Sequence, residues 1–103
     1  MNARITISPE SGTLRIAGRF DLHALPAFRT AFRRLLAACE AARLVVDMAE
    51  TDYMDSSAVG VLLLFRTDAE KRDRSVVLIH CNPFVRDMLH TAQFHRLFAI
   101  DNG

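Results

Sequence analysis

The stretch that decides the fold is residues 44–60, in the middle of the chain. It opens on a β-branched apolar run, Leu44-Val45-Val46-Asp47-Met48, and closes on Asp55-Ser56-Ser57-Ala58-Val59-Gly60. A short run rich in β-branched and other apolar side chains is typical of a strand buried inside a sheet. We predict a loop over residues 49–54 and then a helix from Ser56 to about Arg72. The elements before and after this junction between strand and helix are predicted in turn below.

The N-terminal side of the junction predicts a hairpin followed by a helix. Residues 4–7 and 13–18 alternate polar and apolar side chains, with turn-forming residue types between them. Leu14 and Ile16 then share the inner face of the hairpin. Beyond it the apolar period changes to three and four, which predicts a helix from Leu22 to about Ala41 with Asp21 as N-cap.

The C-terminal side predicts one further buried strand over residues 75–80 and a third helix. Asn82 is its expected N-cap, Pro83 occupies the first helical position, and a last short strand is expected at residues 97–100. The order is therefore ββαβαβα(β). Helices alternating with buried strands imply an α/β fold with a mixed, mostly parallel sheet, the first hairpin at one side and helices packed on it. We expect one domain over residues 1–103.

Composition excludes several classes of protein. The chain has 103 residues, 50% hydrophobic and 24% charged, with a net charge of +1. This is too short for two domains and too apolar for a disordered chain. The charge balance argues against a nucleic-acid partner. Cys39 and Cys81 have no metal-ligand spacing and are expected to be buried free thiols. No signal peptide and no run long enough to insert into a membrane is present, so we expect a cytoplasmic, soluble protein.

The near-neutral total conceals an uneven distribution of charge. Residues 1–43 carry a net +4, residues 44–55 a net −4, and residues 56–103 a net +1. Arg29, Arg33 and Arg34 lie off the apolar stripe of their helix, and we interpret them as a solvated face. The acidic segment leads straight into Asp55 and Ser56, where the free N–H groups of a helix start are expected.

Ser56 has two interpretations from its position alone. Asp55 and Ser56 could serve only to cap the helix, which contributes about 1 kcal/mol. Alternatively, Ser56 is a phosphate acceptor, because a helix N-terminus favours a phosphoserine. The helix that follows is apolar on nearly every side, so it is either buried all round or presents part of an apolar face to a partner. We favour the partly exposed face.

Enzyme motifs are missing. Ser56 is not in a G-x-S-x-G sequence, and His23, His80, His90 and His95 show no metal-binding spacing. Only four glycines occur, and none forms a phosphate-cradling loop. We expect no catalytic residues, no metal and no cofactor.

Four segments resemble, in order, those of one known family. Residues 53–62 read Tyr-Met-Asp-Ser-Ser-Ala-Val-Gly-Val-Leu, and residues 18–21 read Gly-Arg-Phe-Asp. Residues 44–48 and 82–89 match a central strand and the start of a third helix. Together these segments are similar to STAS domains of the bacterial anti-sigma factor antagonist family, over nearly the whole chain.

The resemblance implies a signalling function in transcription regulation. Ser56, or less favourably Ser57, would be phosphorylated by an anti-sigma factor that is also a serine kinase, and a PP2C-type phosphatase would reverse this. The unphosphorylated chain would sequester the kinase and so free the sigma factor, in partner switching. The interface implied by the resemblance comprises Asp21, Asp55, Ser57, Ala58, Val59 and Leu62.

The chain departs from the family pattern in two ways. Ala58 stands where Gly is common, and the chain is expected to lack the family's usual C-terminal helix. Loss of that helix would expose apolar surface and favour a homodimer. An alternative function within the same resemblance is the cytoplasmic STAS subunit of an ABC-type lipid transporter.

Overall fold

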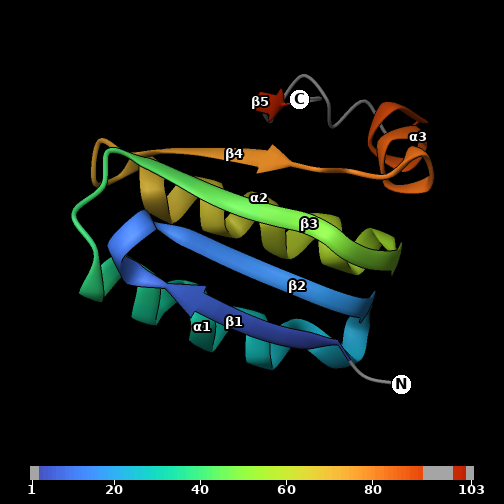
Figure 1. Ribbon diagram of the computed structural model, residues 1–103, viewed down its shortest axis with the longest axis horizontal. Coiled ribbons are helices and arrows are strands. Elements are labelled where there is room, and N and C mark those ends of the chain that lie inside the picture. The colour runs from blue at the N-terminus through green and yellow to red at the C-terminus, as the bar shows by residue number, and fades with distance from the viewer. Residues whose placement is uncertain (1–2, 92–98, 102–103) are drawn as a thin grey trace.

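The computed structural model describes residues 3–91 and 99–101, and Figure 1 shows its arrangement. Five strands form one sheet in the order β1-β2-β3-β4-β5. Strand β1 pairs antiparallel with β2, and every other neighbouring pair is parallel. The strands are β1 (Arg4–Ser8), β2 (Thr13–Phe20), β3 (Arg43–Met54), β4 (Ser75–Ile79) and β5 (Ala99–Asp101). The predicted mixed, mostly parallel sheet with a hairpin at one side is confirmed.

Two helices cover one face of this sheet, and a third lies beyond the end of β4 (Figure 1). The helices are α1 (Leu25–Ala38), α2 (Ser56–Glu70) and α3 (Pro83–Thr91), with short 3₁₀ turns η1 (Pro9–Ser11) and η2 (Leu22–Ala24). Crossover connections put α1 and α2 on the same side, as right-handed crossovers from consecutive parallel strands require. The other face of β1, β2 and β3 carries neither α1 nor α2.

Aromatic rings fill the space between the sheet and its two covering helices. Neighbouring ring centroids lie 5.1–6.0 Å apart in edge-on, tilted and stacked pairs. Each ring is fully buried; they belong to Phe20, Phe28, Phe32 and Phe65. Leu14 and Ile16 lie on the same inner face, as the hairpin alternation predicts. This core fixes α1 and α2 against the sheet, and with them the starts of both helices.

The prediction of a loop over residues 49–54 is wrong, because β3 continues to Met54. These residues pair with the second half of β2 after register shifts that follow Arg15 and Gly18. Adjacent Ala49 and Glu50 are both exposed, which breaks the alternation of buried and less buried residues along β3. Beyond the break, the buried hydroxyl of Thr51 donates to the carbonyl oxygen of Ile16 at 2.8 Å.

The predicted boundaries of the other elements need smaller corrections. The helix expected from Leu22 to Ala41 begins as the 3₁₀ turn η2 and ends at Ala38, because Cys39 has an extended backbone. The last strand, expected at residues 97–100, is observed from Ala99; residues 97 and 98 lie outside the described residues. Asn82 caps α3, with its side-chain oxygen 2.8 Å from the N–H of Val85. Both cysteines are buried free thiols, as expected.

Helix α2 is buried more completely than we predicted. The sheet covers one of its sides and α1 a second, so its apolar residues are almost all inside. The exception is Leu64, which is 38% exposed, beside the half-buried Leu63. The exposed apolar face of this helix is therefore a single narrow strip.

Candidate functional site

Three helix starts meet one edge of the sheet, the edge at which the parallel strands end. Strands β2, β3 and β4 each run into a capping residue: Asp21 before η2, Asp55 before α2, and Asn82 before α3. In open parallel sheets this edge is where ligands and partners bind, because loops and free helix N–H groups converge there.

Asp55 links two of these helix starts. One carboxylate oxygen accepts from the N–H of Ala58 at 2.9 Å, which is the N-cap bond of α2. The other oxygen accepts from the N–H of Leu22 at 3.2 Å, at the start of η2. The Asp55 N–H itself donates to the carbonyl of Phe20 at 3.3 Å. Asp55 is therefore the N-cap, Ser56 is the first helical residue, and the ends of β2 and β3 are held together.

Asp21 also caps a helix start, that of η2, but through a single backbone N–H group. Its carboxylate accepts from the N–H of His23 at 3.0 Å and lies 3.5 Å from Arg19 Nε. Both aspartates predicted at the partner interface are thus half-buried and engaged with backbone N–H groups. Both carboxylates therefore hold the starts of η2 and α2 in place at the edge where the parallel strands end.

Ser56 is exposed, whereas Ser57 is half-buried. Within the described part of the chain, the Ser56 hydroxyl makes no hydrogen bond. Asp55 accepts from the N–H of Ala58, and the N–H groups of Ser56 and Ser57 are among those at a helix start that have no partner within the helix. A hydroxyl in this position is accessible to an enzyme that modifies it.

Three residues predicted to contact a partner lie in the core instead. Ala58, Val59 and Leu62 have no exposed surface and belong to the apolar cluster between sheet and helices. They support the helix start from beneath and do not reach a partner in this structure. The family resemblance implied them as interface residues, and the nearly even apolar pattern of α2 does not reveal which of its sides is covered.

An apolar surface that the sequence did not indicate flanks the helix starts. Leu22 is 59% exposed and Phe84 48% exposed. The Tyr53 ring stacks on Phe84 with centroids 5.6 Å apart, and the Arg19 guanidinium lies 4.0 Å from the centre of the Tyr53 ring. These residues come from η2, α3, and the ends of β3 and β2. Only their convergence in space makes them one surface.

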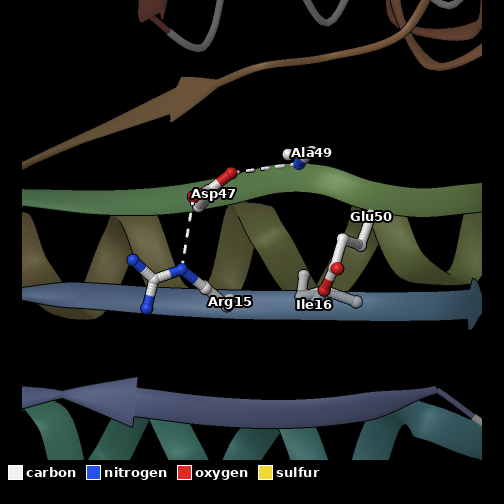
Figure 2. Close-up of a pocket in the computed structure, with 5 residues that line it drawn as sticks. All are labelled: Arg15, Ile16, Asp47, Ala49 and Glu50. Carbon is white, nitrogen blue, oxygen red and sulfur yellow. Dashed lines mark hydrogen bonds and ion pairs between the residues drawn. The ribbon is translucent and has the colours of Figure 1, made fainter.

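A polar cluster occupies the sheet face away from α1 and α2. Asp47 lies 3.4 Å from Arg15 Nε and 3.0 Å from His80 Nδ1, and it accepts from the N–H of Ala49 at 3.0 Å. Burial alone would raise the Asp47 pKa, but these hydrogen bonds and charges outweigh it and lower the pKa. Figure 2 shows the Asp47 contacts to Arg15 and Ala49 beside a hollow of about 250 Å³. This cluster comes from β2, β3 and the residue after β4, away from Ser56.

No group of three His, Cys, Asp or Glu side chains among the described residues could hold a metal ion. No helix in that part of the chain combines the length and apolar character needed to cross a membrane. Burial raises the pKa of the Cys81 thiol to about 11, although Arg86 opposes this, so the thiol is held in its unreactive form.

Comparison with known proteins identifies the family. The family model described as "Mlab, STAS domain" matches residues 3–99. The chain belongs to the STAS domain family. A STAS-domain containing protein of Pseudomonas aeruginosa is 42% identical over 88 residues, which are 85% of this chain and 85% of that protein.

Solved structures of similar shape share the fold of this STAS domain. The anti-sigma factor antagonist SpoIIAA in its unphosphorylated form has a TM-score of 0.69 at 20% identity, covering 99% of this chain and 89% of that one. The phosphorylated form of the Bacillus protein has a TM-score of 0.65 at 19% identity, with coverage of 98% and 92%. A protein of Thermotoga maritima described as a putative anti-sigma factor antagonist reaches 0.77 at 11% identity, with coverage of 98% and 86%.

Proposed function

We propose that this STAS domain is an anti-sigma factor antagonist, a non-catalytic binding module switched by reversible phosphorylation of Ser56. The observation that carries the proposal is the exposed, unbonded Ser56 hydroxyl at the first position of α2, directly after the N-cap Asp55. Its partners are an anti-sigma factor with serine kinase activity and a PP2C-type phosphatase. The proposal places the chain in the cytoplasm, where ATP is available to such a kinase.

Phosphorylation at this position is compatible with the fold. A phosphoserine adds a charge of about −1.5 to −2 at neutral pH, and a helix N-terminus stabilises negative charge through its free N–H groups. The Ser57 N–H adjoins Ser56 and is not taken by Asp55. The phosphate would therefore leave α2 folded and change only the surface.

The same charge opposes binding at a surface that is already acidic. Asp21 and Asp55 line the helix starts, and exposed Asp52 lies two residues before Met54 ends β3. A partner that fits the unphosphorylated edge would have to desolvate the phosphate and approach it together with these carboxylates. The apolar contacts offered by Leu22 and Phe84 remain, but the electrostatic match is lost. Phosphorylation therefore releases the partner and lets it hold the sigma factor.

Two comparisons support the proposal. The 42% identical relative is itself described as a STAS-domain protein, and the SpoIIAA fold has been solved with and without phosphate. The latter pair indicates that a fold of this shape accommodates phosphorylation.

The test is phosphorylation of the purified chain by its partner kinase with ATP, followed by mass spectrometry. We expect one phosphate on wild type and on Ser57→Ala, and none on Ser56→Ala. Phosphate on Ser56→Ala at the wild-type level would defeat the assignment. In binding assays with the same kinase, Ser56→Asp should weaken the complex and Ser56→Ala should preserve it.

The alternative function is that of a STAS subunit of an ABC-type lipid transporter. Affinity capture from native cells, with wild type and Ser56→Asp as parallel baits, separates the two functions. A kinase retained by wild type and lost by Ser56→Asp supports the switch, whereas a permease and ATPase retained equally by both supports the transporter. Homodimer formation remains a separate prediction, and light scattering of the isolated chain tests it.

A further inference from the structure

A groove between α1 and α2 lies at the opposite end of α2 from Ser56. It encloses about 510 Å³ and is lined by Arg33 from α1 and by Asp68, Lys71 and Arg72 at the end of α2. The rise of an α-helix puts Lys71 about 22 Å along the axis from Ser56. The groove is therefore separate from the surface used in the proposed function.

Within the part of the chain that the structure describes, the basic side chains of the groove make no ion pair and no side-chain hydrogen bond. Among the described residues, the ion pairs involve other groups, such as Arg66 with Glu70 at 3.2 Å. Arg33, Lys71 and Arg72 are exposed and make no ion pair there, although Asp68 lies within the same groove. Three unpaired cations beside one carboxylate give the groove a net positive charge, which fits an acidic ligand.

Gly60 lies on α2 between Ser56 and the residues that line this groove. Glycine in a helix interior destabilises the helix relative to alanine, because its backbone loses more freedom on folding. Among residues 3–91 and 99–101, a Cβ at Gly60 would meet no atom within 4 Å, and the φ of Gly60 is not in the left-handed region. Gly60 leaves this face of α2 flat, which permits the close approach of another backbone.

Gly60, Leu64, Asp68 and Lys71 follow one another at helical spacing. Residues three and four apart lie on the same face of a helix. Gly60 is exposed, Leu64 is 38% exposed, and the groove residues follow one turn later. We call this face, together with Arg33 and Arg72, the α2 strip. Along the helix axis, this face has no side chain at Gly60, an apolar side chain at Leu64 and a cluster of basic side chains in the groove.

We propose that the α2 strip, which begins one helical turn beyond Ser56 and ends at the groove, is an interaction surface that binds an acidic amphipathic helix of a partner protein. The partner backbone passes closest at Gly60, its apolar side chains cover Leu64, and its carboxylates pair with Arg33, Lys71 and Arg72. Charge complementarity selects the acidic occupant. A helix suits the strip because its apolar and charged parts lie on one straight line about 17 Å long between Gly60 and Lys71.

The test is an NMR titration of the full ¹⁵N-labelled chain with a lactam-stapled peptide about four helical turns long. The peptide carries alanine and leucine in its first two turns and glutamates on the same face of the last two. A matched peptide has lysines in place of the glutamates. We expect saturable shifts confined to the α2 strip with the acidic peptide and none with the basic one.

Variants of the chain assign the contacts. Lys71→Glu with Arg72→Glu should weaken binding at least about tenfold, since each reversal removes an attraction and adds a repulsion. Arg34→Glu, which changes charge on α1 outside the groove, is the matched control and should weaken it less than about twofold. Gly60→Leu should also weaken binding, and circular dichroism verifies that it remains folded.

Three results would overturn the proposal. The first is no saturable binding of the acidic peptide, or shifts outside the α2 strip. The second is equal loss of affinity for Arg34→Glu and for the double reversal. The third is binding of the strip to vesicles of anionic lipid but not to the peptide, which would make it a lipid-facing surface. A fall in Tm for Gly60→Ala would show that the fold itself needs this glycine, and would also count against the proposal.

Discussion

Replacement of Asp55 by alanine tests whether one carboxylate holds two helix starts together. The variant loses the N-cap bond to Ala58, which contributes about 1 kcal/mol. It also loses the bond from the Leu22 N–H, which contributes about 1 kcal/mol more, because hydrogen bonds to charged groups are stronger than average but this one is exposed. We expect Asp55→Ala to lower the free energy of unfolding by about 2 kcal/mol. For a domain of this size the corresponding fall in Tm is about 10 °C.

Two matched variants separate the contributions. Asp21→Ala loses the single backbone bond to His23 and a long ion pair to Arg19, so it should cost about 1 kcal/mol. Asp55→Asn keeps one acceptor oxygen for Ala58 but replaces the other with a donor, so its cost should also be about 1 kcal/mol. Urea unfolding followed by far-UV circular dichroism gives all three values, and the m-value should stay constant. If Asp55→Ala costs no more than Asp21→Ala, the bridge to Leu22 contributes nothing and the reasoning fails.

Three further predictions concern other parts of the fold. Asp47→Asn should reduce stability at neutral pH, and the deficit should shrink as pH falls toward and below the ordinary carboxyl value of 3.8; a deficit that is unchanged at low pH would contradict this. The sign follows from the lowered folded pKa of Asp47, which stabilises the fold only while the group is ionised. Thr51→Val should cost about 1–2 kcal/mol in urea unfolding, because it leaves the buried Ile16 carbonyl without its partner; a neutral result would mean that water replaces the hydroxyl. Cys81, with a pKa of about 11, should resist thiol-reactive probes in the native chain at about pH 8 and react on unfolding, whereas rapid native labelling would disprove its burial.

The strand boundaries show where sequence reasoning reached its limit. Residues 44–48 read as a strand because every side chain except that of Asp47 is apolar, whereas residues 49–54 read as a loop because they include Glu50 and Asp52. In the structure those residues complete β3 through pairing with β2, with Thr51 bonded to the Ile16 carbonyl. The partner strand lies more than 30 residues away in the chain. The pattern of neighbouring residues in the sequence cannot reveal a pairing with a strand so far away in the chain.

The surface residues around Ser56 show the same limit. Ala58, Val59 and Leu62 were assigned to the interface, and the structure buries all three. Which side of an evenly apolar helix is covered depends on where α1 and the sheet lie. The exposed Leu22 and Phe84, which the sequence did not single out, lie beside the helix starts only because β2 and β4 end at one edge.

The sequence by itself determined the order of the elements, the hairpin, the mostly parallel sheet and the capping residues Asp21, Asp55 and Asn82. These follow from periodicity and from side chains that bond to N–H groups two or three residues away, so the information is local. Tertiary structure alone decided the length of β3, the second bond of Asp55 to Leu22, the stack of Arg19 on Tyr53, and the groove between α1 and the end of α2. Each depends on residues brought together by burial of a shared core, and burial is a property of the whole chain.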